Sequence, residues 1–338
     1  KQLFTDIFCN KILARMKKES KISVFYKKHH DAIIAILILT PMILWWIVAC
    51  GYPLVYGVFL GFFELYDVTQ DPVFIGFQNF QNFFTDTSYL RELWNTIWIG
   101  FASTILINLA GLLVAVALNS VKHLKGFYRS IWYIPAITSS VAITQIFGII
   151  FDPFTGIVNQ ILASNGMDTV SLDSNYGLAI AVILLYSVWK SAGSSAIVWL
   201  AGLQSIDKKL YEAAALDGAN KWTIFKRVTL PSLKPIIIYI IITGISGAFQ
   251  IYEPVAFITN GGPYDLTNVL TLRIIRDGFY DFNIGMSGAS SLILAIIIVA
   301  STLTYYRTTK VDSVKNEKRE RLLMEKRRAK FNKEQICK

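Results

Sequence analysis

Residues 93–118 have the sequence LWNTIWIGFASTILINLAGLLVAVAL, which contains no Asp, Glu, Lys or Arg. A helix rises about 1.5 Å per residue, so roughly 20 apolar residues cross a hydrocarbon core about 30 Å thick. Strands of membrane barrels are only about 10 residues long and alternate polar with apolar residues, which this stretch does not do. The stretch therefore predicts a transmembrane helix.

Further apolar stretches of this kind account for most of the chain. They lie near 31–51, 130–151, 176–200, 235–259 and 286–306. Of the 338 residues 54% are apolar and 17% are charged, whereas about a quarter of the residues in soluble domains are charged. The sequence predicts an all-α membrane protein with six transmembrane helices. Its parts are a basic tail at 1–30, a membrane domain at 31–306 and a charged tail at 307–338.

The basic residues that produce the net charge of +10 alternate from one side of the membrane to the other. Lys and Arg number 8 in residues 1–30, 3 in 119–129, 6 in 202–234 and 12 in 307–338. The other connecting segments contain only Arg91, Arg273 and Arg276. Because Lys and Arg favour cytoplasmic loops, both termini are predicted to be cytoplasmic. The basic residues would face the anionic lipid of the inner leaflet, and no nucleic-acid partner is expected.

The sequence offers few residues for metal binding or catalysis. Its three Cys are too scattered for a disulfide framework or a metal site, and its three His lie near predicted cytosolic helix ends. These features make an intramembrane enzyme improbable. No Gly-x-x-x-x-Gly-Lys-Ser/Thr segment is present, so the chain is not expected to bind ATP itself.

The loop predicted between helices four and five is too long for a simple turn. A Ser or Asp just before Lys208 can cap a short helix over Lys208–Asp217, and Gly218 suits the left-handed residue that ends a helix. A second helical stretch, Lys221–Leu230, then leads to Pro231, which can open the following helix. Two helices that meet at a Gly would form a rigid projection into the cytosol.

The order of residues in this loop resembles the coupling loop of ABC importer permeases. That loop has Glu-Ala-Ala, three residues, Gly, nine residues, then an apolar residue, any residue and Leu-Pro. The matching residues, with every spacing met, are Glu212, Ala213, Ala214, Gly218, Val228, Leu230 and Pro231. Asp217 matches the Asp that often precedes the Gly. Val228 replaces a commoner Ile, and Asp207 stands where many members have Pro.

The resemblance covers roughly 31–306 and is strongest to the carbohydrate-uptake branch of these permeases. The segments that carry it are 74–80 (FIGFQNF), 156–162, 189–190, 201–206 and 259–263 (TNGGP) with Thr267. The last of these is similar to the maltose-F-like member of the two paired permease subunits.

The resemblance implies a type I ABC importer permease fold and a permease subunit of an ATP-driven, binding-protein-dependent importer of sugars or oligosaccharides. The expected location is the prokaryotic plasma (inner) membrane. The implied partners are a second permease subunit, dimeric ATPase subunits and an extracytoplasmic solute-binding protein. The chain itself would be no enzyme and would bind no cofactor, because ATP and Mg belong to the partner ATPase. The residues assigned to ATPase coupling are Glu212, Ala213, Ala214, Asp217, Gly218, Leu230 and Pro231.

Polar groups at membrane depth suggest where a solute passes. Helix five carries Phe249, Gln250, Tyr252 and Glu253 in an otherwise apolar run, and Lys190 lies in helix four. Such residues usually face a cavity or a partner, and aromatic rings, amides and carboxylates suit a sugar. Alternatively, the polar groups of helix five form hydrogen bonds with neighbouring helices and do not contact the solute. Lys190 is more readily explained by snorkelling or by pairing at a subunit interface.

Two other functions remain open on the sequence. One is an ABC permease for a non-sugar solute, such as a glycerol phosphate or a peptide. The other is a stand-alone secondary transporter, which would need coupling-ion carboxylates or inverted repeats, and neither is recognisable in the sequence.

Overall fold

A computed structural model describes residues 21–66, 71–121 and 123–307, with side chains from residue 34 onward. Residues 1–20 and 308–338, which make up most of the two predicted tails, lie outside the described residues. The chain divides into a first unit, Lys1–Phe59, and a second unit, Leu60–Lys338.

The first unit contains one long helical segment. It consists of α2 (Lys21–Trp46), the π-helix η1 (Ile47–Gly51) and α3 (Tyr52–Leu60), the last of which ends at the first residue of the second unit. Its apolar part, Ile34–Leu60, is long enough to cross a membrane. This confirms the helix predicted near 31–51, which contains Pro41, and extends it to Leu60.

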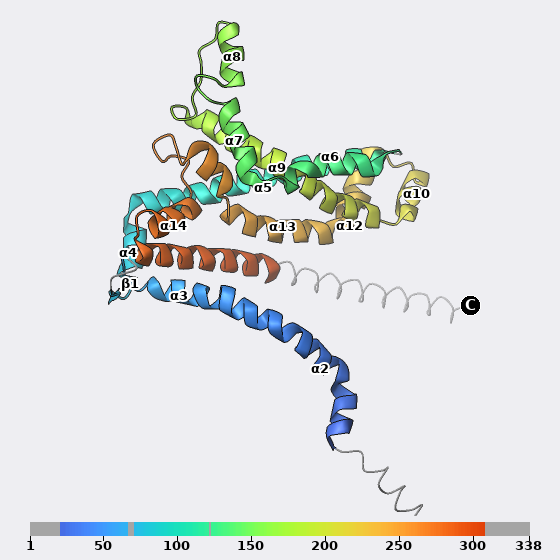
Figure 1. Ribbon diagram of the computed structural model, residues 1–338. Coiled ribbons are helices and arrows are strands. Elements are labelled where there is room, and N and C mark those ends of the chain that lie inside the picture. The colour runs from blue at the N-terminus through green and yellow to red at the C-terminus, as the bar shows by residue number, and fades with distance from the viewer. Residues whose placement is uncertain (1–20, 67–70, 122, 308–338) are drawn as a thin grey trace, which may run out of the picture. The chain divides into compact units, whose positions relative to one another are not determined.

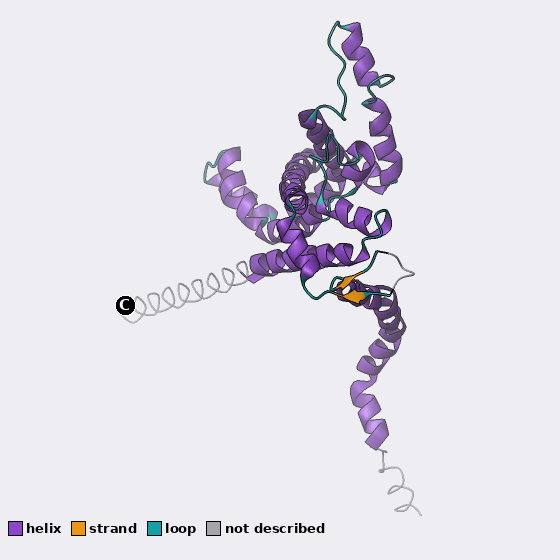
Figure 2. Ribbon diagram, turned by 90° about the vertical axis from the view of Figure 1, so that its left-hand side faces the viewer, coloured by secondary structure: helices purple, strands orange, loops and turns teal. Residues whose placement is uncertain are grey.

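The second unit contains the remaining elements, and nearly all of them are helical (Figures 1 and 2). They are β1 (Phe63–Glu64), β2 (Val73–Phe74), α4 (Gln78–Thr85), α5 (Thr87–Ser120), α6 (Lys125–Ile137), α7 (Ser140–Ile150), α8 (Ile157–Ser164), α9 (Tyr176–Ser205), α10 (Lys208–Leu216), α11 (Lys221–Ile224), η2 (Phe225–Thr229), α12 (Leu230–Ser232), α13 (Lys234–Phe249), η3 (Val255–Thr259), α14 (Leu270–Phe279) and a helix over Ile284–Arg307. The two short strands pair antiparallel, with Phe63 opposite Phe74.

Four helices among the described residues are long and apolar enough to cross a membrane. They are Ile34–Leu60, Thr87–Ser120, Tyr176–Ser205 and Ile284–Arg307. Two bent helix pairs raise the number to six if each pair is one span: α6 with α7, bent by 86°, and the segment Lys221–Ser232 with α13, bent by 65°. The four long spans lie where the sequence predicts apolar stretches. The 86° bend breaks the helix predicted near 130–151, and the 65° bend lies just before the one predicted near 235–259.

The predicted helix over 235–259 is wrong as a continuous element. α13 ends at Phe249, Ile251 and Tyr252 are not helical, and the π-helix η3 begins after Pro254. Proline lacks the N–H that would bond the carbonyl four residues earlier, and its ring clashes with that carbonyl. The polar residues predicted within helix five therefore lie at a helix break.

Small residues allow the central helices of the second unit to pack closely. Gly193 of α9 lies against the carbonyl of Trp132 in α6, and a methyl group added at Gly193 would overlap with that oxygen. Gly100 of α5 lies in the same way against the carbonyl of Ala248 in α13. Close backbone approach of this kind is the usual basis of helix packing inside membranes. It brings α6 against α9 and α13 against α5.

Candidate functional site

The predicted coupling loop forms a short, well-capped helix, α10. The Asp207 carboxylate accepts a 3.0 Å hydrogen bond from the Lys209 N–H, which makes Asp207 the N-cap. Gly218 has φ +73°, the left-handed conformation predicted for it. The Ala219 N–H reaches back to the Ala214 carbonyl at 3.0 Å, which closes the helix end. Figure 1 shows α10 beyond the Lys234 end of α13, and α14 beyond its other end.

Most of the residues that the resemblance assigns to coupling are on the surface of this loop. Ala214 is half-buried, and the exposed ones are Glu212, Ala213, Asp217, Gly218, Leu230 and Pro231. The Tyr211 hydroxyl lies 3.2 Å from the Thr229 hydroxyl and joins α10 to η2. Pro231 lies within α12 rather than opening the long helix, because the chain bends at Leu233 before α13 starts at Lys234.

Two large apolar side chains of this loop were missed by the sequence analysis. Leu216, the last residue of α10, is 90% exposed, and Trp222 of α11 is 70% exposed. The Trp222 ring stacks on Phe225 with the ring centroids 5.8 Å apart. Their position beside Gly218 in a polar loop was the available signal. Exposed apolar groups on a rigid projection are suited to contact another protein surface.

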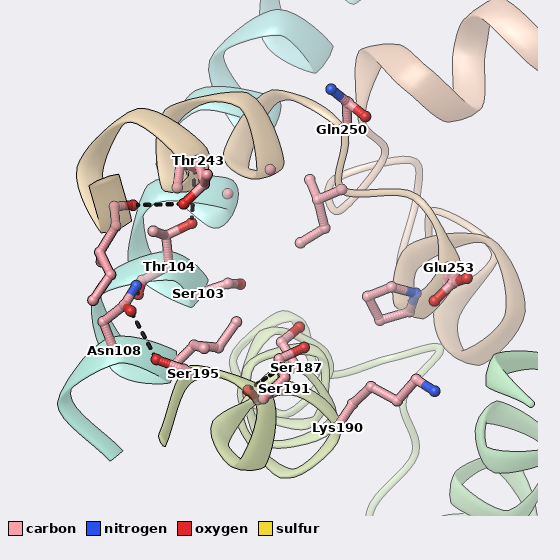
Figure 3. Close-up of a pocket in the computed structure, with 18 of the residues that line it drawn as sticks. Ser103, Thr104, Asn108, Ser187, Lys190, Ser191, Ser195, Thr243, Gln250 and Glu253 are labelled. Atoms are coloured by element: carbon pink, nitrogen blue, oxygen red, sulfur yellow. Dashed lines mark hydrogen bonds between the residues drawn. The ribbon is translucent and has the colours of Figure 1, made fainter. Parts of the chain in front are cut away.

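A cavity of about 600 Å³ lies between α5, α9, α13 and the break that follows α13. Its lining is rich in hydroxyl and amide groups, contributed by Ser103, Thr104, Asn108, Tyr186, Ser187, Ser191, Ser194, Ser195, Tyr239, Thr243, Gln250 and Tyr252. In Figure 3 the side chains of Ser103, Ser187 and Ser191 point toward the middle of this space. Polar groups that converge on a cavity between apolar helices are typical of a solute path.

Four of the five residues predicted for the solute path line this cavity. Gln250, Tyr252, Glu253 and Lys190 do so, with Gln250 and Glu253 exposed. Phe249 does not line it: the side chain is buried at 3% exposure in an apolar cluster with Phe83, Tyr89 and Leu270. The helix ends directly after Phe249, so the Phe249 side chain packs into the apolar cluster while the residues that follow it line the cavity.

The amine of Lys190 is held by the protein backbone. Lys190 Nζ donates to the carbonyls of Pro135 at 3.1 Å and Ala136 at 3.3 Å, and also to that of Thr138. These carbonyls lie at the end of α6, where a helix leaves its last carbonyls without intrahelical partners. Lys190 therefore bridges α9 to the α6–α7 break. The sequence analysis did not predict this contact, since it explained Lys190 by snorkelling or by pairing at a subunit interface.

The serines of the cavity were also missed, although α9 contains a signal for them. Ser187, Ser191 and Ser194 recur at helical spacing on an otherwise apolar helix. Ser195 donates a 2.8 Å hydrogen bond to the side-chain oxygen of Asn108 in α5. Ser103 is 4% exposed, and its hydroxyl has no hydrogen-bond partner among the described residues. A buried hydroxyl without a partner is costly, so it favours a ligand that supplies one.

Polar side chains also fix the loops around two segments that carry the family resemblance, 74–80 and 156–162. The side-chain amide of Asn79 donates to the carbonyls of Gly61 and Phe63, at 3.0 and 2.9 Å. The Asn159 amide group donates to the carbonyls of Asp152 and Val170, at 2.9 and 2.8 Å. Hydrogen bonds from Thr155 and Phe154 lower the pKa of Asp152 below its ordinary value.

The Thr259–Pro263 turn is held in the same way. Arg276 donates to the carbonyl of Asn260 at 2.8 Å and forms an ion pair with Asp265 at 3.1 Å. The Thr267 hydroxyl donates to the Gly262 carbonyl at 2.6 Å. These contacts give the end of the unit beside α14 a fixed shape.

The family of the chain follows from comparison with known proteins. Residues 107–311, well over half of the chain, match the family described as binding-protein-dependent transport system inner membrane component. The chain belongs to this family. It is a multi-pass membrane protein and a permease subunit of the ABC transporter type, a transport component whose ATPase activity resides in a separate subunit.

Similar permeases are known in several bacteria. The probable ABC transporter permease YesP of Bacillus subtilis is 32% identical over 80% of this chain and 88% of its own length. The sn-glycerol-3-phosphate transport system permease UgpA of Agrobacterium fabrum is 31% identical over 69% and 80%. The arabinooligosaccharides transport system permease AraP of Bacillus subtilis is 30% identical over 79% and 85%.

The fold matches that of a bacterial alginate ABC transporter. One crystal structure of this transporter has a chain with a TM-score of 0.74 and 23% identity, covering 85% of this permease and 98% of that chain. A second structure, in complex with an alginate pentasaccharide-bound periplasmic protein, has a TM-score of 0.73 at 25% identity, covering 83% and 95%. The predicted ABC importer permease fold is thereby confirmed.

Proposed function

We propose that this permease carries sugars or oligosaccharides inward, and that it does so together with a second permease subunit, an ATPase dimer and an extracytoplasmic solute-binding protein. In this arrangement each bent helix pair counts as one of six crossings, and both termini are cytoplasmic. The observation that carries the proposal is the cavity of about 600 Å³, whose hydroxyl-rich lining lies between helices that are otherwise apolar. Hydroxyls and amides exchange hydrogen bonds readily with a polyhydroxy solute.

The coupling loop supports the assignment of the energy source. α10 is short, capped at both ends and exposed, and it is joined to α13 through η2 and α12. A short rigid helix seated in a groove of an ATPase would transmit the closure of that ATPase to the membrane helices. Glu212 and the alanines of α10 would occupy this groove, and Gly218 would set the bend behind them. ATP and Mg would bind to the ATPase and not to this chain.

The geometry of the cavity and the similar proteins support the proposal of a paired subunit and a binding protein. The cavity opens between α5, α9 and α13, so one copy of the chain supplies only part of a closed path. The end of the unit beside α14, with its fixed loops, would receive the solute-binding protein. The alginate transporter was crystallised with such a periplasmic protein.

Glycerol phosphate is a second candidate solute, because several of the similar permeases are named for sn-glycerol-3-phosphate transport. The two candidates are distinguished by uptake. The complete transporter in proteoliposomes with internal ATP should accumulate a labelled oligosaccharide delivered by its binding protein. Uptake by this chain alone without ATP, or uptake of glycerol 3-phosphate in place of every saccharide, would refute the proposal. Co-purification should also recover an ATPase and a second permease with the chain.

A further inference from the structure

Two charged side chains occur among the described residues that line the cavity, Lys190 of α9 and Glu253 of the break after α13. Neither forms an ion pair with another described residue. Figure 3 shows the Lys190 amine directed away from Ser187 and Ser191, toward a neighbouring segment. Lys190 and Glu253 therefore do not neutralise each other, and each contacts different groups of the protein.

The positive charge of Lys190 is already engaged. An ammonium group has three N–H donors, and three backbone carbonyls accept from it, those of Pro135, Ala136 and Thr138. These carbonyls belong to the C-terminal end of α6, where the helix dipole places partial negative charge. A phosphate or carboxylate in the cavity would have to displace these carbonyls in order to pair with Lys190.

The negative charge of Glu253 is open to a ligand. Among the described residues its side chain accepts one hydrogen bond, from the Tyr186 hydroxyl at 3.4 Å, which is longer than the usual 2.5–3.0 Å for two oxygens. A carboxylate has about four lone-pair positions, so Glu253 keeps most of its acceptor capacity. The other polar groups around the cavity are neutral hydroxyls and amides, among them the unpartnered hydroxyl of Ser103.

We propose that this cavity selects uncharged, hydroxyl-rich solutes and rejects anionic ones such as glycerol phosphates and saccharides that carry a uronate. The proposal rests on the proposed function, since it assumes that the cavity is the solute path. An anion entering it meets the carboxylate of Glu253 and finds, among the described residues of this chain that line the cavity, no cation other than the engaged Lys190. Like charges repel strongly where water is scarce. A neutral saccharide instead donates hydroxyl hydrogen bonds to Glu253, and such charge-assisted bonds are stronger than neutral ones.

The test measures solute binding to the purified transporter without its binding protein, so that only the membrane part selects. The probes are arabinose, glucose and galactose trisaccharides, each paired with a form in which one primary alcohol is oxidised to a carboxylate, together with glycerol 3-phosphate. We expect at least one neutral trisaccharide to bind at least tenfold more tightly than its acidic counterpart. The Glu253→Gln variant should reduce this ratio at least fivefold, chiefly by improving the binding of the acid. The control Asp152→Asn, a carboxylate on a loop outside the cavity, should leave the ratio unchanged.

Three results would overturn the selectivity. The first is an acidic trisaccharide or glycerol 3-phosphate that binds as tightly as the best neutral probe. The second is a ratio of neutral to acidic affinity that Glu253→Gln leaves unchanged. The third is an equal reduction of this ratio by Asp152→Asn. If an acidic saccharide also stimulates ATP hydrolysis by the complete transporter, the import function stands and only the selectivity falls. If no probe binds and none stimulates hydrolysis, both the function and the selectivity fall.

Discussion

The Tyr89 hydroxyl donates a 2.7 Å hydrogen bond to Asp277 Oδ2 and so joins the first turn of α5 to α14 across 188 positions of sequence. Arg273 completes the cluster: its Nε lies 2.8 Å from Asp277 Oδ1, and its guanidinium lies 4.7 Å from the centre of the Tyr89 ring. Both carboxylate oxygens of Asp277 thus have a partner. Burial raises the pKa of Asp277 above its ordinary value, and Tyr89 and Arg273 act against that rise.

Replacement of Tyr89 by Phe should destabilise the protein. The substitution removes the donor to Asp277 Oδ2 while the carboxylate stays buried, and a buried acceptor left without its partner costs about 1–3 kcal/mol. We expect a lower apparent melting temperature of the purified transporter. Tyr264→Phe is the matched control, because Tyr264 is 88% exposed, and it should melt as the wild type does. Equal melting of all three proteins would show that the cluster adds nothing to stability.

Replacement of Gly218 by Val should uncouple solute from ATP hydrolysis. Gly218 has φ +73°, and a β-branched residue held there costs about 1–3 kcal/mol of backbone strain. The closed end of α10 would open, so solute-stimulated ATP hydrolysis should fall at least tenfold while the amount of protein in the membrane is retained. Gly218→Asn should keep most of the activity, because Asn tolerates this conformation.

The control for this prediction is Gly126→Val. A side chain at Gly126 meets nothing within 4 Å, and its backbone is not left-handed. It should hydrolyse ATP like the wild type. Full activity of Gly218→Val would remove the coupling role from this turn.

The exposed apolar side chains of the coupling loop should contribute to binding of the ATPase. Leu216→Asp places a charge where a partner would bury an apolar group, so we expect the affinity for the ATPase to fall about tenfold, or about 1.4 kcal/mol. Phe154→Asp is the control, since Phe154 is equally exposed at 90% but lies in the α7–α8 loop, far along the chain from α10. Binding can be followed by titrating labelled ATPase onto the membrane subunits. An equal loss in both variants would indicate a general effect of added charge.

Local features of the fold could be predicted well from the sequence. The start of α10 and the turn at Gly218 depend on residues within a few positions of each other, namely the capping carboxylate of Asp207 and the conformational freedom of Gly218. The apolar stretches were also found correctly, since crossing a membrane requires a long apolar run whatever lies beside it.

Features that depend on distant parts of the chain could not be predicted. Lys190 is held by carbonyls more than 50 positions away, at a helix break that begins three residues beyond Pro135. Phe249 and Gln250 were both expected in helix five and on the solute path, but α13 ends between them and separates a buried ring from cavity-lining residues. Only the packing of whole helices decides which side of such a break faces the cavity.

Replacement of Lys190 by Met should weaken both stability and transport, because Lys190 positions the α6–α7 break that borders the path. The substitution keeps a long side chain but removes all three donors from the carbonyls of α6, and a hydrogen bond to a charged group contributes about 1.5–3 kcal/mol net to stability. We expect a lower melting temperature and a several-fold lower rate of uptake for every solute, with the preference for neutral over acidic solutes retained. Lys190→Arg should restore much of the uptake, since the guanidinium also donates to carbonyls. Lys125→Met, at an exposed position on α6, is the matched control and should behave as the wild type. A Lys190→Met transporter that is as stable as the wild type, but has lost the uptake of one particular solute, would instead identify Lys190 as a ligand of that solute.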